Sequence, residues 1–133
     1  MDTEKALKLL REVRDAAFAT VSPDGMPEVR IIDVMLVDAD SLYFCTARGK
    51  DFYEQLIRTG KVAVAGLTKD YKDIRVSGTA RRLPGQKAWI DRIFEENPSM
   101  NAVYPGVSRY ILEAFRVEDA QIEVFDLNTS PIE

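Results

Sequence analysis

A short stretch in the middle of the chain, TARGK at residues 46–50, carries the side chains best suited to bind an anion. It lies where a strand-like apolar run ends and a helical pattern begins. Gly49 allows close approach of the backbone to a ligand, and the free N–H groups at the start of the next helix attract negative charge. Lys50 adds an ammonium group and Thr46 a hydroxyl group. The stretch predicts a site for an anionic group such as a terminal phosphate, although cations at strand ends are also common as solvated surface charges.

Arg30 is the second cation that we expect at this site. Residues 28–37 and 42–46 both have strand character, and the turn sequence at 38–41 predicts that they form an antiparallel hairpin. In that pairing Arg30 and Thr46 lie at the same end of the two strands, far from the turn. A guanidinium group, an ammonium group, a hydroxyl and a helix N-terminus would then surround one phosphate.

The composition excludes several other kinds of site and partner. The sequence has no histidine and one cysteine, so it lacks the residues for a histidine-based triad, a zinc site or an internal disulfide, and we expect no metal. Its net charge of −4 argues against a general nucleic-acid binder. No segment approaches the ~20 consecutive apolar residues of a membrane span, and the charged first residues do not resemble a secretory signal. We therefore expect a cytoplasmic protein with neither a membrane nor a nucleic-acid partner.

The spacing of apolar residues divides the chain into helices and strands that we assign to one domain, residues 1–133. Helical spacing predicts helices at 3–14, 50–59 and 84–96. Alternation of apolar and polar residues predicts seven strands, at 16–22, 28–37, 42–46, 61–68, 73–83, 109–117 and 120–127. Short turns join most of them, which favours a mainly β fold, a closed or nearly closed antiparallel barrel with flanking helices, over an open α+β sheet.

The strand at 28–37 is apolar on both faces. One face would fill the barrel, and the other, which carries Arg30 together with Ile32, Val34 and Leu36, needs a second cover. A helix, another subunit or a flat aromatic ligand would each supply that cover, and the pattern alone does not choose among them.

The order of these features resembles a known family. The stretch ATVSPDGMPEVRIIDVMLVDADSLYFCTARGKDFYEQLIRTGKVAVAGL, followed by IRVSGTARRL and FRVEDAQIEVFDL, is similar to the pyridoxamine 5′-phosphate oxidase-like FMN-binding split-barrel family over about residues 5 to 128. The resemblance implies a six-stranded antiparallel split β-barrel of Greek-key type. It also implies a homodimer that holds FMN in the clefts between its subunits, so that a subunit and a flavin would cover the second face of the strand at 28–37.

The resemblance also assigns roles to individual residues. Arg30 and Lys50 would contact the FMN phosphate, and Thr46 would add its hydroxyl. Arg48 lies in the loop that corresponds to the phosphate loop of the family, and Gln55 matches a family position on the next helix. The backbone that would run along the isoalloxazine ring comprises Ile31, Ile32, Asp33 and Val34.

By this resemblance the protein is an FMN-dependent oxidoreductase, such as a flavin reductase, that acts on an unknown small molecule. A flavin carrier or redox sensor, a barrel that binds deazaflavin F420 or haem, and a cofactor-free dimeric module are the alternatives. Haem is disfavoured because no histidine is present to ligate it. Vitamin B6 phosphate is not expected as the substrate, because no basic residue follows Arg116.

The sequence does not identify a catalytic acid or base. Three aromatic residues could line the substrate side, but packing is the more common role for each of them: Tyr71, Trp89 and Tyr104. Cys45 is expected to be a buried small apolar residue and not a nucleophile, because there is no histidine to activate it.

Overall fold

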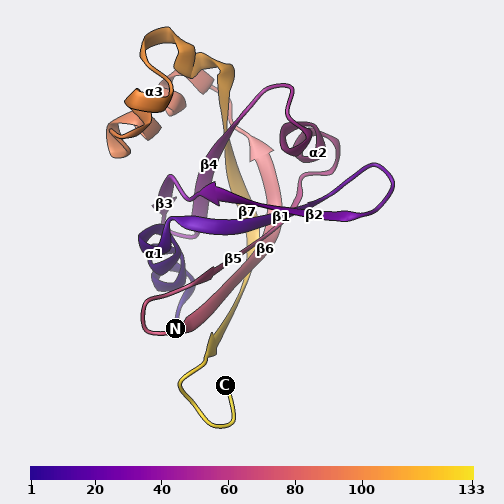
Figure 1. Ribbon diagram of the computed structural model, residues 1–133, viewed down its shortest axis with the longest axis vertical. Coiled ribbons are helices and arrows are strands. Elements are labelled where there is room, and N and C mark those ends of the chain that lie inside the picture. The colour runs from indigo at the N-terminus through magenta and orange to yellow at the C-terminus, as the bar shows by residue number, and fades with distance from the viewer.

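The computed structural model describes all residues, 1–133, as a curled antiparallel sheet with helices packed around it (Figure 1). The helices are α1 (Thr3–Val13), α2 (Asp51–Thr59), α3 (Gln86–Glu96), α4 (Met100–Val103) and the 3-10 helix η1 (Gly106–Ile111). The strands are β1 (Asp15–Val21), β2 (Pro27–Asp33), β3 (Leu36–Asp38), β4 (Ser41–Ala47), β5 (Lys61–Leu67), β6 (Lys72–Arg82) and β7 (Leu112–Asp126). No helix has both the length and the apolar character needed to cross a membrane.

Local signals in the sequence explain where the first two helices begin and end. The Asp2 side chain accepts a hydrogen bond of 2.8 Å from the Lys5 N–H and so caps α1. Gly60 ends α2 in the left-handed conformation, with a φ of 70° that glycine adopts without strain.

The sheet has the order β2-β1-β5-β6-β7-β4-β3, with every pair antiparallel. Its two edges, β2 and β3, follow each other directly in the sequence and are separated only by a bend at residues 34–35. Counted as one bent strand, they make this a barrel of six strands, as the family resemblance implies. The chain crosses from β4 to β5 through α2, which is the long connection of a Greek key.

The bend overturns the hairpin predicted for residues 28–37 and 42–46. Only β3 pairs with β4, through Leu36 opposite Tyr43 and Val37 opposite Leu42. β2 turns away and pairs with β1, with Arg30 opposite Phe18. The barrel is therefore closed at the bend and split open between β2 and β4.

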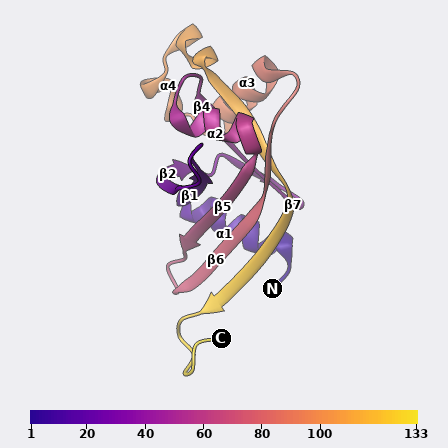
Figure 2. The ribbon, with the colours of Figure 1, turned by 90° about the vertical axis from the view of Figure 1, so that its right-hand side faces the viewer.

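The last two predicted strands are in fact one. β7 runs unbroken through residues 118–120, and residues 109–111 belong to η1. The turn predicted at residues 118–120 is instead a bulge. The register of β6 and β7 shifts between Ser77 and Thr79, and Asp119 has a φ of 54°. A β-carbon on Gly78 would lie 2.5 Å from the Glu118 carbonyl oxygen, so only glycine fits opposite the bulge. Figure 2 shows the long β7 beside β6, with β5 on the other side of β6.

Two apolar clusters fill the molecule. The larger one occupies the barrel, where the Phe18 ring lies 5.0 Å from that of Phe44 and 6.2 Å from that of Phe52. The smaller cluster lies between the outer face of the sheet and α3, with Ile93 and Phe94 at its centre. These clusters hold β4 and the start of α2 in fixed positions, and the split lies beside them.

Cys45 and the three aromatic residues can now be placed. Cys45 is buried in the smaller cluster, and burial raises the pKa of its thiol to about 12, so the expectation of a buried apolar residue is confirmed. Trp89 stacks on Tyr43 with ring centres 4.9 Å apart, and Tyr104 packs on the same cluster. Tyr71 differs, since it lies exposed in the loop between β5 and β6.

Candidate functional site

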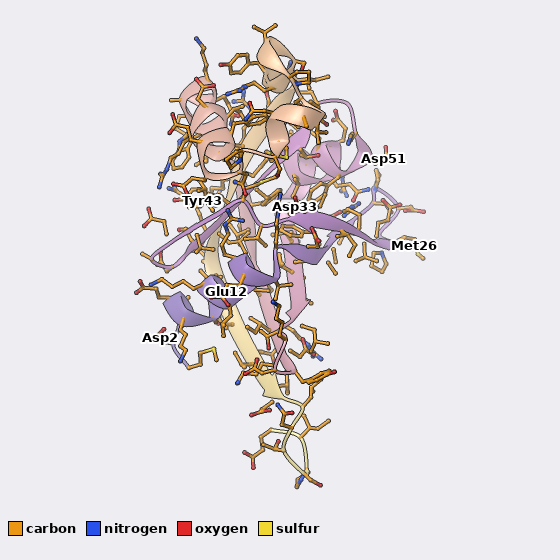
Figure 3. The ribbon with its side chains drawn as sticks, turned by 60° about the vertical axis from the view of Figure 1, so that its left-hand side comes forward. Asp2, Glu12, Met26, Asp33, Tyr43 and Asp51 are labelled. Atoms are coloured by element: carbon orange, nitrogen blue, oxygen red, sulfur yellow. The ribbon has the colours of Figure 1, made fainter.

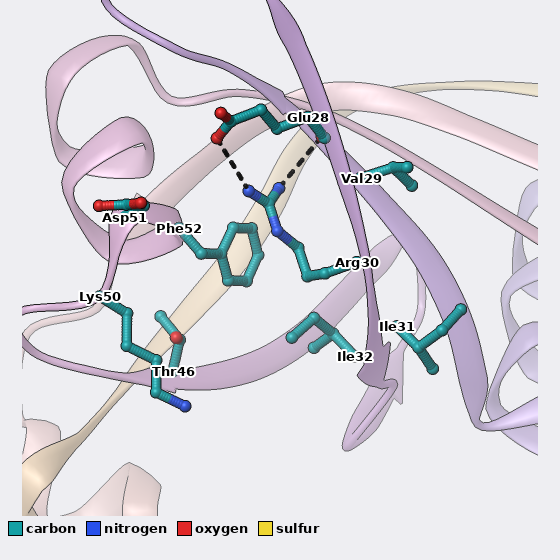
Figure 4. Close-up of a pocket in the computed structure, with 9 residues that line it drawn as sticks. All are labelled: Glu28, Val29, Arg30, Ile31, Ile32, Thr46, Lys50, Asp51 and Phe52. Carbon is teal, nitrogen blue, oxygen red and sulfur yellow. Dashed lines mark hydrogen bonds and ion pairs between the residues drawn. The ribbon is translucent and has the colours of Figure 1, made fainter.

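A cleft of about 670 Å³ opens at the split of the barrel, between β2, the end of β4 and the start of α2. Its lining residues, drawn in Figure 4, are Glu28, Val29, Arg30, Ile31, Ile32, Thr46, Lys50, Asp51 and Phe52. Five of the nine predicted cofactor-binding residues therefore line one cavity, although the hairpin that was expected to bring them together does not form. Asp33, Val34, Arg48 and Gln55 lie outside it.

The start of α2 provides the electropositive end of the cleft. After β4 the chain turns at Gly49, whose φ is 88°, and Lys50 occupies the cap position of a nine-residue helix. No side chain caps this helix, so the N–H groups of its first turn are available to a ligand. Lys50 is exposed, with no hydrogen bond or ion pair to the other residues of the cleft (Figure 4). Thr46, the penultimate residue of β4, also lines the cleft and is 4% exposed.

Arg30 lines the same cleft, but its guanidinium is already engaged by the protein. It donates hydrogen bonds of 2.6 Å to the Thr20 hydroxyl and 3.3 Å to the Phe18 carbonyl, and it lies 3.8 Å from the Glu28 carboxylate. The guanidinium also stacks over the Phe52 ring at 4.5 Å. Burial lowers the pKa of Arg30, and the carboxylates of Glu28 and Asp51 partly offset this. Figure 4 shows Arg30 reaching toward Glu28 and Lys50 pointing elsewhere.

Gln55 contacts the residues that surround the Arg30 guanidinium. It is 4% exposed, accepts a hydrogen bond from Thr20, and donates one of 2.6 Å to Glu28. Its amide oxygen also lies 3.5 Å from the Arg30 guanidinium. Gln55 thus supports the wall of the cleft from inside the barrel and does not face its opening.

The remaining predicted residues are engaged elsewhere. Asp33 lies 3.3 Å from the Arg14 guanidinium, and burial together with the neighbouring Asp15 carboxyl raises its pKa. Val34 is fully buried at the bend, where its N–H donates to the Arg14 carbonyl at 2.8 Å. Arg48 donates to the Tyr110 carbonyl at 3.1 Å, which directs it toward η1.

The outer side of β2 is the least covered apolar surface near the cleft. Val29 is 68% exposed and Ile31 64%, and β2 has no strand partner on its outer edge. This reverses the predicted faces of the strand, because Arg30 and Ile32 turn toward the barrel while Val29 and Ile31 face outward. Figure 3 shows the β2 hairpin projecting from the body, with Met26 at its tip and Asp51 above it. A long apolar edge of this kind is normally covered by another chain or a ligand.

Sequence reasoning missed one functional candidate, the buried carboxylate Glu113 behind the cleft. It lies on β7 opposite Thr46 and is 5% exposed. Arg82 donates hydrogen bonds of 2.8 and 2.9 Å to it, the Tyr53 hydroxyl donates another, and Arg48 lies at 3.6 Å. The only signal in the sequence is a charged residue inside an apolar strand pattern, LEAF at 112–115.

The cleft suits a ligand with a flat apolar part and an anionic end. The β2 side offers aliphatic side chains and a free backbone edge, and the α2 side offers Lys50, Thr46 and unpaired N–H groups. A volume of this size is in the range of pockets that hold small organic ligands and cofactors.

Comparison with protein families and solved structures gives a consistent result. A family model described as pyridoxamine 5′-phosphate oxidase matches residues 2–121. A NimC/NimA family protein from Clostridium acetobutylicum is 23% identical with a TM-score of 0.80, and the match covers 92% of this chain and 83% of that one. A FAD-binding protein from Mesorhizobium loti is 22% identical with a TM-score of 0.72, covering 93% and 94%. A protein named F420 reductase is 18% identical with a TM-score of 0.69, covering 87% and 94%. At these identities the structures show a shared fold, and a search of curated proteins finds no match.

Proposed function

Because the chain belongs to the pyridoxamine 5′-phosphate oxidase family, we propose that it is a flavoprotein that binds FMN in the cleft between β2 and α2 and acts as an oxidoreductase on a small molecule. The observation that carries the proposal is the pairing, in one cavity, of an apolar strand edge with an uncapped helix N-terminus and a free lysine. This combination matches the two ends of FMN, an aromatic ring system and a phosphate dianion. The relatives named for FAD and F420 support a flavin-type ligand.

Three groups would hold the phosphate. The Lys50 ammonium group would pair with it, the Thr46 hydroxyl would donate a hydrogen bond, and the first N–H groups of α2 would face its oxygens. Arg30 would add positive charge from the cleft wall, although its existing hydrogen bonds limit how far it can reach.

The β2 side would orient the ring. The backbone of residues 31–33 forms an open strand edge, which can donate and accept hydrogen bonds along a planar heterocycle. Bound FMN would supply the transfer of a hydride or an electron pair at its N5 atom. The role of the chain is then to fix the ring against β2, to keep water from one face and to leave the other open to substrate.

A second copy of the chain would complete the site. Val29 and Ile31, which line the cleft, also leave an exposed apolar strip on the outside of β2. A homodimer that covers this strip would bury both the strip and the edge of the flavin, with one FMN for each cleft. The lone cysteine, which is buried and unpaired, suits the reducing cytoplasm in which we propose that the protein works.

F420 is a second candidate ligand, because a protein named F420 reductase shares the fold. The cleft argues for FMN, however, because its only cations are Arg30 and Lys50, and it offers no further basic residue for the long acidic tail of F420.

The experiment that tests the proposal is a flavin-binding measurement on the purified protein. Excess FMN is added, free flavin is removed by desalting, and the absorbance near the ~450 nm flavin band is recorded. Retained absorbance supports the proposal, and a protein that retains neither FMN nor its own chromophore refutes it. NAD(P)H is then added without oxygen: bleaching of the bound flavin indicates a reductase, and a flavin that stays oxidised favours a carrier or sensor.

A further inference from the structure

A buried charge network lies directly behind the phosphate end of the cleft, and its centre is Glu113. This carboxylate receives two hydrogen bonds from Arg82 on β6, one from the Tyr53 hydroxyl on α2, and an ion pair from Arg48 in the 46–50 loop. None of these four side chains lines the cleft. The network therefore has no direct contact with a ligand there.

The partners of Glu113 come from the segments that form the electropositive end of the cleft. Tyr53 belongs to the first turn of α2, whose N–H groups would face the phosphate. Arg48 is two residues from Lys50, and its main-chain N–H also donates to the Ile111 carbonyl at 3.2 Å. Glu113 itself lies opposite Thr46 in the ladder between β4 and β7.

The segment 46–50 has few side-chain contacts of its own that would fix the position of Lys50. Gly49 gives it a flexible backbone, and no side chain caps the start of α2. Lys50 is held by main-chain hydrogen bonds alone, from its N–H to the Ala47 carbonyl at 3.4 Å and from the Glu54 N–H to its carbonyl at 3.0 Å. An ordered loop binds an anion more tightly than a mobile one, because the entropy of ordering is lost on folding and not on binding.

From this arrangement, and on the basis of the proposed function, we propose that Glu113 is a positioning residue for the phosphate end of the flavin. It would act through Arg48 and Tyr53 to hold the loop and the first turn of α2 in the geometry that binds the phosphate. The hydrogen bonds from Arg82 and Tyr53 lower the pKa of Glu113 to about 2, so the carboxylate stays ionised at any pH at which the protein would work.

A purely structural role would give a different result, and the chain provides a matched control. Glu118 also lies on β7 and also binds two arginines, Arg81 at 2.8 Å and Arg116 at 2.7 Å, but it has no contact with the loop or α2. Glu113→Gln and Glu118→Gln therefore both remove a carboxylate that is held by arginines, although the Glu118 side chain is more exposed, at 27% against 7% for Glu113. Only Glu113 contacts the loop and α2.

The test compares FMN with riboflavin, which lacks the phosphate. We expect Glu113→Gln to weaken FMN binding on the order of 10-fold, the effect of losing preorganisation of one charged contact, while riboflavin affinity stays unchanged. Glu118→Gln should change neither affinity. An equal loss for both ligands, or no loss for FMN, would overturn the positioning role.

A second measurement does not depend on flavin. Hydrogen exchange of the backbone amides at residues 48–53 should be faster in Glu113→Gln than in the wild type and in Glu118→Gln. If exchange in this segment is unchanged, the positioning role is wrong whatever the protein binds. If exchange is faster but the wild type binds no FMN, the proposed function fails and the anchoring of the loop stands.

Discussion

The two cations that the family resemblance places on the phosphate should respond differently to substitution. Arg30 is 23% exposed in its side chain and holds Thr20, Phe18 and Glu28 together, whereas Lys50 is exposed and lacks such partners. Arg30→Ala should therefore destabilise the protein, and Lys50→Ala should not.

The magnitude follows from the contacts that are lost. Hydrogen bonds from a charged donor contribute about 1.5–3 kcal/mol, and a guanidinium stacked on an aromatic ring adds about 0.5–1 kcal/mol. The unfolding free energy of Arg30→Ala should fall by about 2–4 kcal/mol, which lowers Tm on the order of 10 °C for a chain of this size. Lys50→Ala should change it by less than about 0.5 kcal/mol, but removal of a direct phosphate contact should weaken FMN binding roughly 10- to 150-fold.

Thermal unfolding and flavin titration on the same preparations provide the assay. Arg75→Ala is a matched control, since Arg75 stacks on Phe125 at 4.6 Å and pairs with Asp73 at 2.8 Å, but is 53% exposed in its side chain. Its Tm should fall much less than that of Arg30→Ala. The reasoning is refuted if Arg30→Ala unfolds within about 2 °C of the wild type, or if Lys50→Ala binds FMN with undiminished affinity.

Three further predictions concern other parts of the molecule. The folded-state pKa of Glu113 lies below its ordinary value of 4.5, so the stability that its ionised form contributes is present above pH 4.5 and is lost as pH falls toward 2. Over this range the unfolding free energy of the wild type should fall by about 1–3 kcal/mol through Glu113, after solvent screening. Glu113→Gln should abolish this part of the pH dependence. Ile31→Asp should convert the proposed dimer to monomers in sedimentation experiments, because it places a charge on the apolar strip that the second copy would cover. Leu67→Asp, at an exposed apolar residue away from the cleft, should leave the oligomeric state of the wild type unchanged. Cys45 should react with a disulfide reagent at pH 8 more than about 100-fold slower in the native than in the unfolded protein, since burial raises its pKa to about 12; fast native labelling would contradict its placement.

Most of the fold follows from local patterns, and the exceptions have physical causes. The hairpin of β1 and β2 and the end of α2 at Gly60 are specified by nearby residues, and the sequence predicts them. The sequence predicts one strand at 28–37, but the chain bends between β2 and β3, and residues 34–36 are all apolar because the bend buries each of them. The acidic residues at 118–119 look like a turn in sequence, yet a bulge opposite Gly78 absorbs them inside β7.

The site was less predictable than the fold because its charges are assigned by long-range contacts. Thr46, Lys50 and Arg30 do meet in one cleft, but they meet across the split of the barrel and not along a hairpin. Arg48 is held outside the cleft by its hydrogen bond to the Tyr110 carbonyl and its ion pair with Glu113, two residues that are distant from it in the sequence. A residue pattern identifies which groups carry charge, whereas only the folded structure shows which charges are already neutralised by a partner.

The distribution of charge in the cleft links cofactor binding to assembly. Arg30 and Lys50 are opposed by Glu28 and Asp51, so the cleft of one chain offers little net positive charge to a phosphate dianion. In the proposed complex with FMN, much of the binding free energy would then come from burial of the flat ring against β2. In the proposed dimer, a second copy of the chain would cover the exposed strip around Val29 and Ile31. A ligand that binds the dimer better than the monomer stabilises the dimer by the same free energy, since such coupling is reciprocal. In the proposed dimer, therefore, flavin binding and subunit association strengthen each other, and the exposed edge of β2 is the element that couples them.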